Sequence, residues 1–249
     1  MRLFCLLLIL VSISDLMSQI VNIERSRSNK EEKGFKTNLF LNASYSQNTK
    51  EIFQGGFDLE SQFQKDESSL LLLANMVFVR ADGNNYLNRG FQHLRYNYSI
   101  PKSILKLECF IQNQFNEVQK IKNRKLLGAG LRFSIANKDS FRLYYGLAFM
   151  HENERTTDNF QSLIFRYSSY LSLYFHLNEG ISMNLITYIQ PSASEILLDY
   201  RLSSEGQIQF KINKYLQYQL RLNVLKDSDP IAGVPERILS ISNGLKIQW

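Results

Sequence analysis

The stretch ILSISNGLKIQW, residues 238 to 249, ends the chain and alternates between apolar and polar residues. Leu239, Ile241, Leu245 and Trp249 share one face of an extended strand, because successive side chains of a strand point to opposite sides. The intervening residues, most of them polar, fall on the other face. The pattern predicts a β-strand with one apolar and one polar face.

The same period of two returns along almost the whole chain after Phe35. Phe141, Leu143 and Tyr145, for example, alternate with Arg142 and Tyr144, and similar segments recur before and after them. About twelve segments of this kind can be recognised, an even number, as single-chain outer-membrane barrels require. The sequence predicts an all-β fold, namely a single antiparallel up-and-down transmembrane β-barrel of about 12 strands.

The connections between the predicted strands alternate in length. The short set comprises residues 65–68, 99–103, 136–140, 178–180 and 213–215, and the long set comprises residues 80–89, 116–124, 151–160, 190–198 and 227–236. Short turns at one end and long loops at the other are typical of a barrel with both termini in the periplasm. The four prolines all fall in predicted turns or loops, as expected for a residue that cannot donate to a sheet ladder.

The N-terminus predicts export. Arg2 precedes the apolar run LFCLLLILVSI, which has the length of a secretory signal and is too short to span a membrane. We therefore predict a signal peptide over residues 1–18, with its cleavage site open. Residues 19–34 are charged and aperiodic and are predicted to be a flexible periplasmic extension, which leaves residues 35–249 for a barrel in the cell outer membrane.

Composition narrows the classes of protein. The length of 249 residues suits one domain, and apart from the N-terminal run no apolar stretch approaches the length of a spanning helix. Outside the signal peptide Cys109 is the one cysteine, so an internal disulfide is excluded. The net charge of +6 is scattered along the chain, which argues against a nucleic-acid partner.

A soluble β-sandwich or lipocalin-like barrel would show the same alternation with its apolar face turned inward. The periodicity alone does not decide between the two. The length, the signal peptide and the many long charged residues on the polar face favour a barrel with lipid outside.

The final third of the chain resembles a known family. The resemblance is carried by residues 199–224, by the closing strand and most specifically by the loop DSDPIAGVP at residues 227–235. GFDLESQFQKDES and LLGAGLRFSI support it. The chain is similar to an uncharacterised outer-membrane family that includes a salt-stress-induced outer-membrane protein. That resemblance implies a Gram-negative outer-membrane barrel without an established enzyme activity.

In such a barrel the polar face lines the lumen, because a charged side chain facing lipid near the midplane costs roughly 2 to 4 kcal/mol. Fourteen charged residues are expected to point inward, nine of them basic and five acidic. They are Asp58, Glu60, Arg95, Lys106, Glu108, Arg132, Arg142, Arg166, Asp199, Arg201, Glu205, Lys211, Arg221 and Lys246. The positive excess suggests a passive channel for small, anionic solutes. A closed lumen of mutually paired charges, in a structural or envelope-stress barrel, is the alternative.

The remaining candidates are weaker. His151 lies in HENERTTD with acidic residues beside it, but a polar loop histidine is usually solvated, so an outer-membrane hydrolase is less favoured. No catalytic residue, metal or cofactor is predicted. Lys120, Lys122, Arg124 and Lys125 could bind lipopolysaccharide phosphates from a loop. Trp249 is a predicted signal for the outer-membrane assembly machinery, and the oligomeric state stays open.

Overall fold

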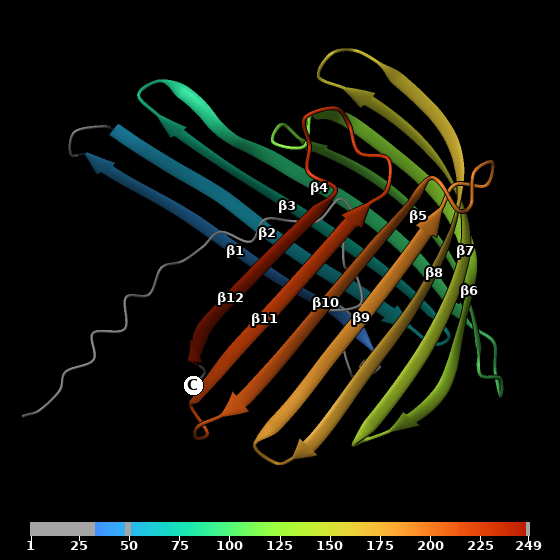
Figure 1. Cartoon of the computed structure of the whole chain (residues 1–249). Helices are drawn as coiled ribbons and strands as arrows, with labels where there is room; N and C mark the ends of the chain where they lie inside the picture. Colours follow the sequence, from blue (N-terminus) through green and yellow to red (C-terminus); the bar gives the residue numbers. More distant parts are fainter. Residues whose placement is uncertain (1–32, 48–50, 248–249) are drawn as a thin grey trace, which may run out of the picture.

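One sheet of twelve antiparallel strands, paired strictly in chain order, makes up the fold (Figure 1). The computed structural model describes residues 33–47 and 51–247, and the side chains of Asn85, Lys246 and Ile247 are not described. Every neighbouring pair in the sheet is antiparallel and consecutive in sequence. The predicted all-β, up-and-down fold of 12 strands is confirmed.

The strands are long, from 11 to 18 residues. They are β1 (Gly34–Gln47), β2 (Glu51–Lys65), β3 (Ser68–Ala81), β4 (Asn84–Ser99), β5 (Leu105–Asn116), β6 (Ile121–Lys138), β7 (Phe141–Thr156), β8 (Gln161–Asn178), β9 (Ile181–Pro191), β10 (Tyr200–Lys211), β11 (Leu216–Asp227) and β12 (Arg237–Ile247).

Three of the predicted long loops are wrong. Residues 80–89, 116–124 and 151–160 are largely strand, joined by connections at residues 82–83, 117–120 and 157–160. Asp82 and Gly83 both have positive φ, 49° and 77°, as a two-residue hairpin turn requires. Polar composition made these segments look like loops, yet the hydrogen-bonded ladder continues through them. Residues 192–199 and 228–236 remain the long connections at this end, which we call the loop end.

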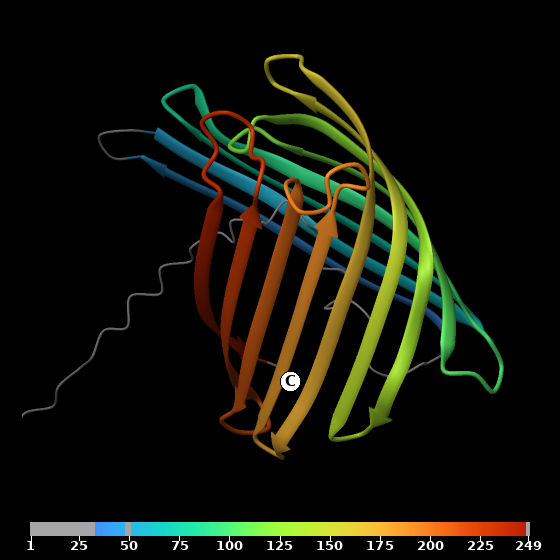
Figure 2. The ribbon, with the colours of Figure 1, turned by 45° about the vertical axis from the view of Figure 1, so that its right-hand side comes forward.

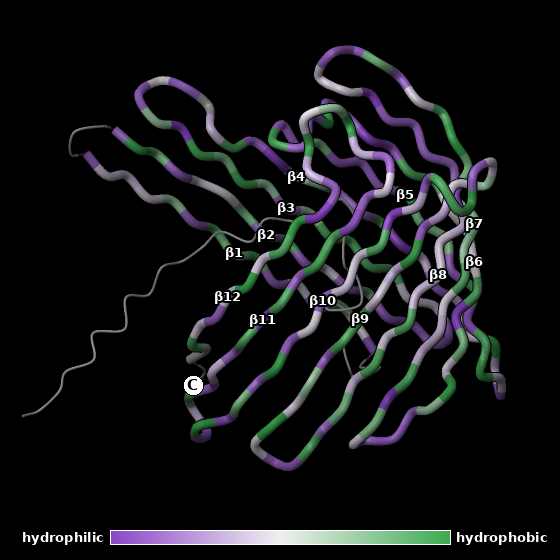
Figure 3. The backbone as a smooth tube through the Cα atoms, viewed as in Figure 1, coloured by the Kyte–Doolittle hydropathy of each residue, from purple (hydrophilic) through white to green (hydrophobic). Residues whose placement is uncertain are grey.

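Hydrophilic and hydrophobic residues alternate along the strands (Figure 3). Side-chain burial shows that the two faces of the sheet differ in polarity in the sense that the barrel requires. On β8, Arg166, Ser168 and Ser172 are buried, whereas Phe165 and Leu171, next to them in sequence, are about half exposed. Among the buried side chains of the described residues, polar and charged ones outnumber hydrophobic ones. A soluble sandwich or lipocalin-like barrel would show the reverse, so the apolar face is the outer one.

The sheet curls on itself, so that β1–β4 lie behind β9–β12 (Figures 1 and 2). Leu71 and Leu73 on β3 join Tyr170, Ile186 and Tyr188 of β8 and β9 in one buried cluster. Strands five and six positions apart in the sheet therefore pack against each other through the interior. We call these five residues the apolar layer.

The order of strands in the sheet ends at β1 and β12, and no hydrogen bond joins these two strands within the described residues. The closure of the predicted barrel between its first and last strands is therefore not seen within the described residues. Every residue of β1 is exposed. The buried residues of the strands lie on β2 to β11.

A glycine permits the close packing of the interior at one position. A Cβ atom on Gly146 of β7 would lie 2.0 Å from the ring of Tyr170, which is its partner on β8. Because Gly146 has no side chain, the ring can lie directly against the backbone of β7, and its hydroxyl donates to Glu108 Oε2 of β5 at 3.1 Å. Tyr170 thus reaches across β7 and β6 to β5 inside the sheet.

Several N- and C-terminal predictions fall outside the described residues. They are the signal peptide, most of the extension over residues 19–34, and the assembly signal Trp249. Lys33 is the first residue that the structure describes, and its ammonium group lies 2.8 Å from Asp66 Oδ1 in the β2–β3 turn. The part of the chain that is described has no helix with the length and apolarity needed to span a membrane.

Candidate functional site

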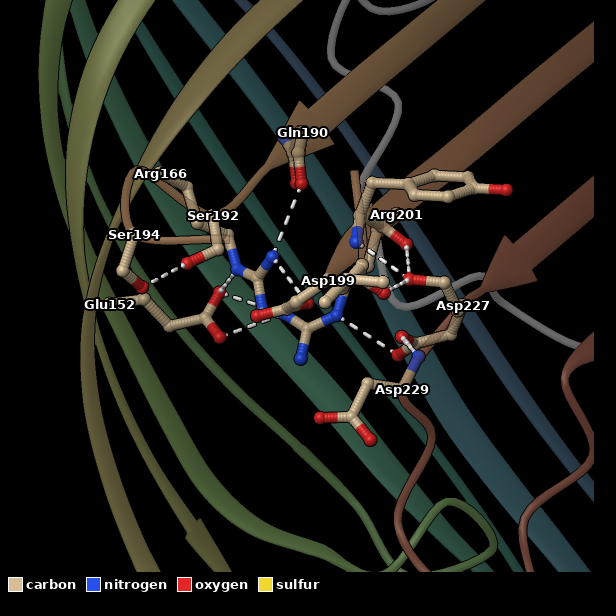
Figure 4. A network of polar contacts seen from close by, with 12 residues as sticks. Glu152, Arg166, Gln190, Ser192, Ser194, Asp199, Arg201, Asp227 and Asp229 are labelled. Carbon is tan, nitrogen blue, oxygen red and sulfur yellow. Dashed lines mark hydrogen bonds and ion pairs between the residues drawn. The ribbon is translucent and has the colours of Figure 1, made fainter. Parts of the chain in front are cut away.

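Buried ion pairs fill the interior near the loop end (Figure 4). Arg201 of β10 is the centre, and its Nη1 donates to both carboxylate oxygens of Glu152 on β7 at 2.8 Å. Its Nε donates to Asp227 Oδ2 of β11 at 3.0 Å, and its Nη2 lies 3.4 Å from Glu154 Oε2. One guanidinium therefore ties together three strands.

Arg166 of β8 occupies the other side of Glu152. Its Nε lies 3.5 Å from Glu152 Oε2, and its Nη groups bind Asp199 at 2.9 to 3.0 Å and the Gln190 carbonyl oxygen at 3.2 Å. Arg124 of β6 pairs with Glu154. We call Arg124, Glu152, Glu154, Arg166, Asp199, Arg201 and Asp227 the loop-end network.

Burial makes the ion pairs of this network important for stability. The side chains of Arg124, Glu152 and Arg166 are at most 2% exposed. An ion in such a place costs several kcal/mol of desolvation, which is recovered only when its charge is met by well-placed partners. The seven residues satisfy this condition together, so removing one takes away a buried counter-charge from each of its partners.

Strand alternation aims these side chains inward. Glu152 and Glu154 are two apart on β7, and Arg124 is the cross-strand partner of Glu154. A bulge at Lys122 shifts the register of β6, so that Ile121 and Arg124, three apart, are both buried. The bulge thus allows Ile121 and Arg124 both to face the interior, at the point where β6 begins after the β5–β6 turn.

A second group of polar side chains lies deeper, between β4 and β8. Arg95 Nη1 lies 2.9 Å from Glu108 Oε2, the oxygen that also accepts the Tyr170 hydroxyl. Arg95 Nε lies 3.4 Å from His93 Nε2, and Gln112 is hydrogen-bonded to His93 Nδ1 at 2.9 Å. His93, Arg95, Glu108 and Gln112 form this middle network, which adjoins the apolar layer through Tyr170.

Two arginines toward the short-turn end stack on tyrosines. The Arg132 guanidinium lies 4.0 Å from the ring centroid of Tyr144, and that of Arg142 lies 4.2 Å from Tyr174. Such cation–π contacts suit a guanidinium partly removed from water. The interior therefore carries arginine along its length, held by carboxylates near the loops and by aromatic rings toward the turns.

One long connection reaches across the loop end of the sheet. Lys120 Nζ in the β5–β6 turn donates to the Ala232 carbonyl oxygen, in the β11–β12 connection, at 2.6 Å. Val234 of the same connection is buried. Residues 228–236 therefore bridge from β11 and β12 to the turn at β6, beside the loop-end network.

The structure places the predicted lumen residues as follows. Arg95, Glu108, Arg132, Arg166 and Arg201 are buried. Glu60, Lys106, Arg142, Asp199, Glu205 and Arg221 are partly buried, Asp58 and Lys211 are exposed, and the side chain of Lys246 lies outside the described set. The register aligns the residues within the strands on the same face as the buried ones. That they line an open pore stays a prediction.

Four members of the loop-end network were not among the predicted lumen residues: Arg124, Glu152, Glu154 and Asp227. The signal that could have found them is the alternation of Glu152, Glu154 and Thr156, which continues the inward face of β7. His151 lies on the other face, with its ring 5.1 Å from that of Phe165. It does not join Glu152 and Glu154, and the described residues contain no cluster of three or more metal-ligating side chains.

A single up-and-down sheet, apolar outside and charged inside, defines an outer-membrane-type β-barrel protein. Solved structures agree on the fold: the NanC porin superposes with a TM-score of 0.50 at 8% identity, over 86% of this chain and 99% of that one. The chain belongs to the family described as protein of unknown function, DUF481, whose profile matches residues 27–247.

Two further solved structures are similar at lower scores. The TodX monoaromatic hydrocarbon channel gives a TM-score of 0.42 at 9% identity, over 86% of this chain and 78% of that one. The outer membrane channel DcaP of Acinetobacter baumannii gives a TM-score of 0.38 at 5% identity, over 85% of this chain and 97% of that one. No curated protein sequence matches the chain.

Proposed function

We propose that this protein is an integral barrel of the outer membrane whose lumen is occluded, and that it serves as a structural component of the envelope rather than as a constitutively open pore. The observation that carries the proposal is the contact of β3 with β8 and β9 through the interior. Leu71, Leu73 and Tyr170 are at most 5% exposed. Side chains that line a water-filled channel would be solvated instead.

The buried charges support the same reading. In an open pore, water and mobile ions would solvate the loop-end network, and arginines would be free to meet a passing solute. Here Glu152 is held between Arg166 and Arg201, with both partners buried. The connection over residues 228–236 adds a cover at the same end.

Single-channel recording in planar bilayers tests the proposal. We expect purified wild-type protein to insert without conductance steps in concentrated KCl. A variant that thins the apolar layer, Leu71→Ala with Leu73→Ala and Tyr170→Ala, is expected to conduct, because three large side chains leave the interior. Regular conductance steps from the wild-type protein would overturn the occluded-lumen proposal.

A second candidate is a passive channel for small anionic solutes. It is favoured by the arginine-rich interior, in which Arg89, Arg95, Arg124, Arg132, Arg166 and Arg201 are all buried. A channel lined in this way selects anions. This candidate would be supported if the wild-type protein gave conductance steps and if its reversal potential in a KCl gradient were displaced toward that of chloride.

The sequence resemblance to a family that includes a salt-stress-induced protein suggests a physiological test. If the barrel acts in envelope stress, a deletion strain is expected to grow like its parent in low salt and to lag at high salt. Complementation by the wild-type gene restores growth. Equal growth of the deletion strain under both conditions argues against the stress role.

A further inference from the structure

The outward surface of β6, β7 and β8 changes in chemistry over a short distance near the loop end. Leu127, Phe149 and Phe165 form an exposed apolar patch. Two residues closer to the loops on β6, Lys125 is exposed, and beyond it Lys122 and Arg155 are exposed as well. A basic band therefore borders an apolar surface on the outside of the sheet.

The register fixes the shape of this basic band, which we define as Lys122, Lys125 and Arg155. Arg155 is the cross-strand partner of Asn123, and Lys125 is the partner of Asn153, so Arg155 and Lys125 are diagonal neighbours. Lys122 is the residue at the bulge, and its Nζ donates to Asn159 Oδ1 at 3.1 Å. The three cations thus lie together at the rim.

The band differs from the four basic residues predicted as a loop cluster. Arg124 points inward and pairs with Glu154, and Lys120 donates to Ala232. They do not share a surface with Lys122 and Lys125, whereas Arg155 does. The acidic residues of β7 in this region also point inward, and the exposed acids in the adjoining turns are Glu117 (β5–β6) and Asp158 (β7–β8).

We infer that the basic band binds the phosphate groups of lipopolysaccharide, with the acyl chains resting on Leu127, Phe149 and Phe165. This inference rests on the outer-membrane placement proposed above. A phosphorylated lipid places its anionic groups at the boundary between acyl chains and water, which is the boundary seen between patch and band. Lysine and arginine recognise phosphate by charge-assisted hydrogen bonds. The β7–β8 hairpin carrying Arg155 projects far at the loop end (Figure 1).

Titration of the full-length protein in detergent with purified diphosphoryl lipopolysaccharide tests the inference. The variant Lys122→Ala with Lys125→Ala and Arg155→Ala is expected to bind about a hundredfold more weakly, at roughly fivefold for each charge. The matched control removes three exposed lysines at the opposite rim, Lys65→Ala, Lys138→Ala and Lys214→Ala. It is expected to keep its affinity within about twofold, because isolated surface charges contribute little.

Equal weakening in both triple variants, or no binding by the wild-type protein, would overturn the inference. Heat-modifiable migration confirms that each variant is folded. Dephosphorylated lipid provides a second readout: the wild-type protein is expected to lose its affinity for it to the same extent as the band variant does for the intact lipid.

Surface labelling tests the proposed outer-membrane placement of the loop end separately from the binding of lipopolysaccharide by the band. Asp158→Cys, made in a Cys109→Ser background, is expected to react with a membrane-impermeant maleimide in intact cells. Labelling together with absent lipopolysaccharide binding overturns the band alone. Labelling only after cell lysis overturns the proposed placement of the loop end as well.

Discussion

Glu152 shows at the scale of one residue how the interior is held together. Its carboxylate meets Arg201 at 2.8 Å and Arg166 at 3.5 Å, and all three side chains are buried. A guanidinium group carries a permanent positive charge, so each of the two arginines needs a carboxylate nearby. Exchange of either arginine for a neutral residue removes one of the two positive charges that hold this buried carboxylate.

The variant Glu152→Gln keeps the shape and removes the charge. We expect it to lower the free energy of unfolding by about 3 kcal/mol, because the buried Arg166 and Arg201 lose the carboxylate that lies between them. Urea unfolding in phospholipid vesicles, followed by gel mobility, measures the loss. The control Glu205→Gln affects a looser pair, 3.9 Å from Arg221 Nε, and should cost less than about 1 kcal/mol. Equal losses would contradict the assigned role of Glu152.

The packing of Tyr170 on Gly146 gives a second residue-scale prediction. Gly146→Ala must displace the ring, since the new Cβ would lie 2.0 Å from it, and roughly 1 to 3 kcal/mol of stability should be lost. Gly206→Ala is the control, because its Cβ would meet nothing nearer than Leu185 at 3.8 Å. The same urea titration compares them. A Gly146→Ala variant as stable as wild type would show that Tyr170 is not fixed in this way.

Sequence alternation could predict that Arg166 and Arg201 point inward, because parity along a strand follows from backbone geometry. It could not predict their partners. Arg201 and Glu152 are 49 residues apart and lie on strands that are not neighbours in the sheet, so their contact depends on how the sheet curls. The apolar layer has the same origin, since β3 meets β8 and β9 only after curling.

At the scale of elements, β7 and β8 extend beyond the segments that were predicted from the sequence to face lipid. HENERTTD was predicted as a loop because of its charge, yet β7 continues to Thr156. A hairpin outside the membrane loses nothing by carrying polar residues on both faces, so hydropathy does not mark where such a strand ends. The turns at the other end were predicted more closely, because there strand and apolar belt end together.

Depth along β8 yields a prediction about the outer face. Leu171 and Leu177 are both about half exposed on this face, but Leu171 lies mid-strand and Leu177 is the penultimate residue. Leu171→Lys should cost roughly 2 to 4 kcal/mol and Leu177→Lys about 0 to 1 kcal/mol, because the cost of a lipid-facing charge falls toward the interface. Folding yield and urea unfolding in vesicles measure both. Similar, small costs would indicate water on this face.

At the scale of the whole molecule, the free edges of β1 and β12 set a requirement. In a bilayer an unpaired strand edge leaves backbone groups without hydrogen bonds, at several kcal/mol each, so spanning sheets are closed. The two strands run antiparallel in an even-numbered sheet, and their outer faces carry Leu39 and Leu41 on one and Ile241 on the other. Membrane insertion is therefore expected to bring these edges together.

Cysteine cross-linking tests this closure. In a Cys109→Ser background, Ile241→Cys combined in turn with Leu39→Cys, Leu41→Cys or Ala43→Cys should form a disulfide in at least one pair after insertion. Ile241→Cys with Leu171→Cys is the control, because β8 is not adjacent to β12. If no β1 position reacts in the inserted protein, the two strands do not close the sheet at this level.

Site-directed spin labelling of β8 in bilayers tests the central claim, an outward apolar face around an occluded interior, most directly. Nitroxides at Ser169 and Leu171 are predicted to be relaxed by oxygen, as in lipid, and nitroxides at the buried Ser168 and Ser172 to be protected from both oxygen and a water-soluble nickel complex. Strong relaxation of the Ser168 and Ser172 labels by the nickel complex would contradict the account, because it would show that water fills the lumen.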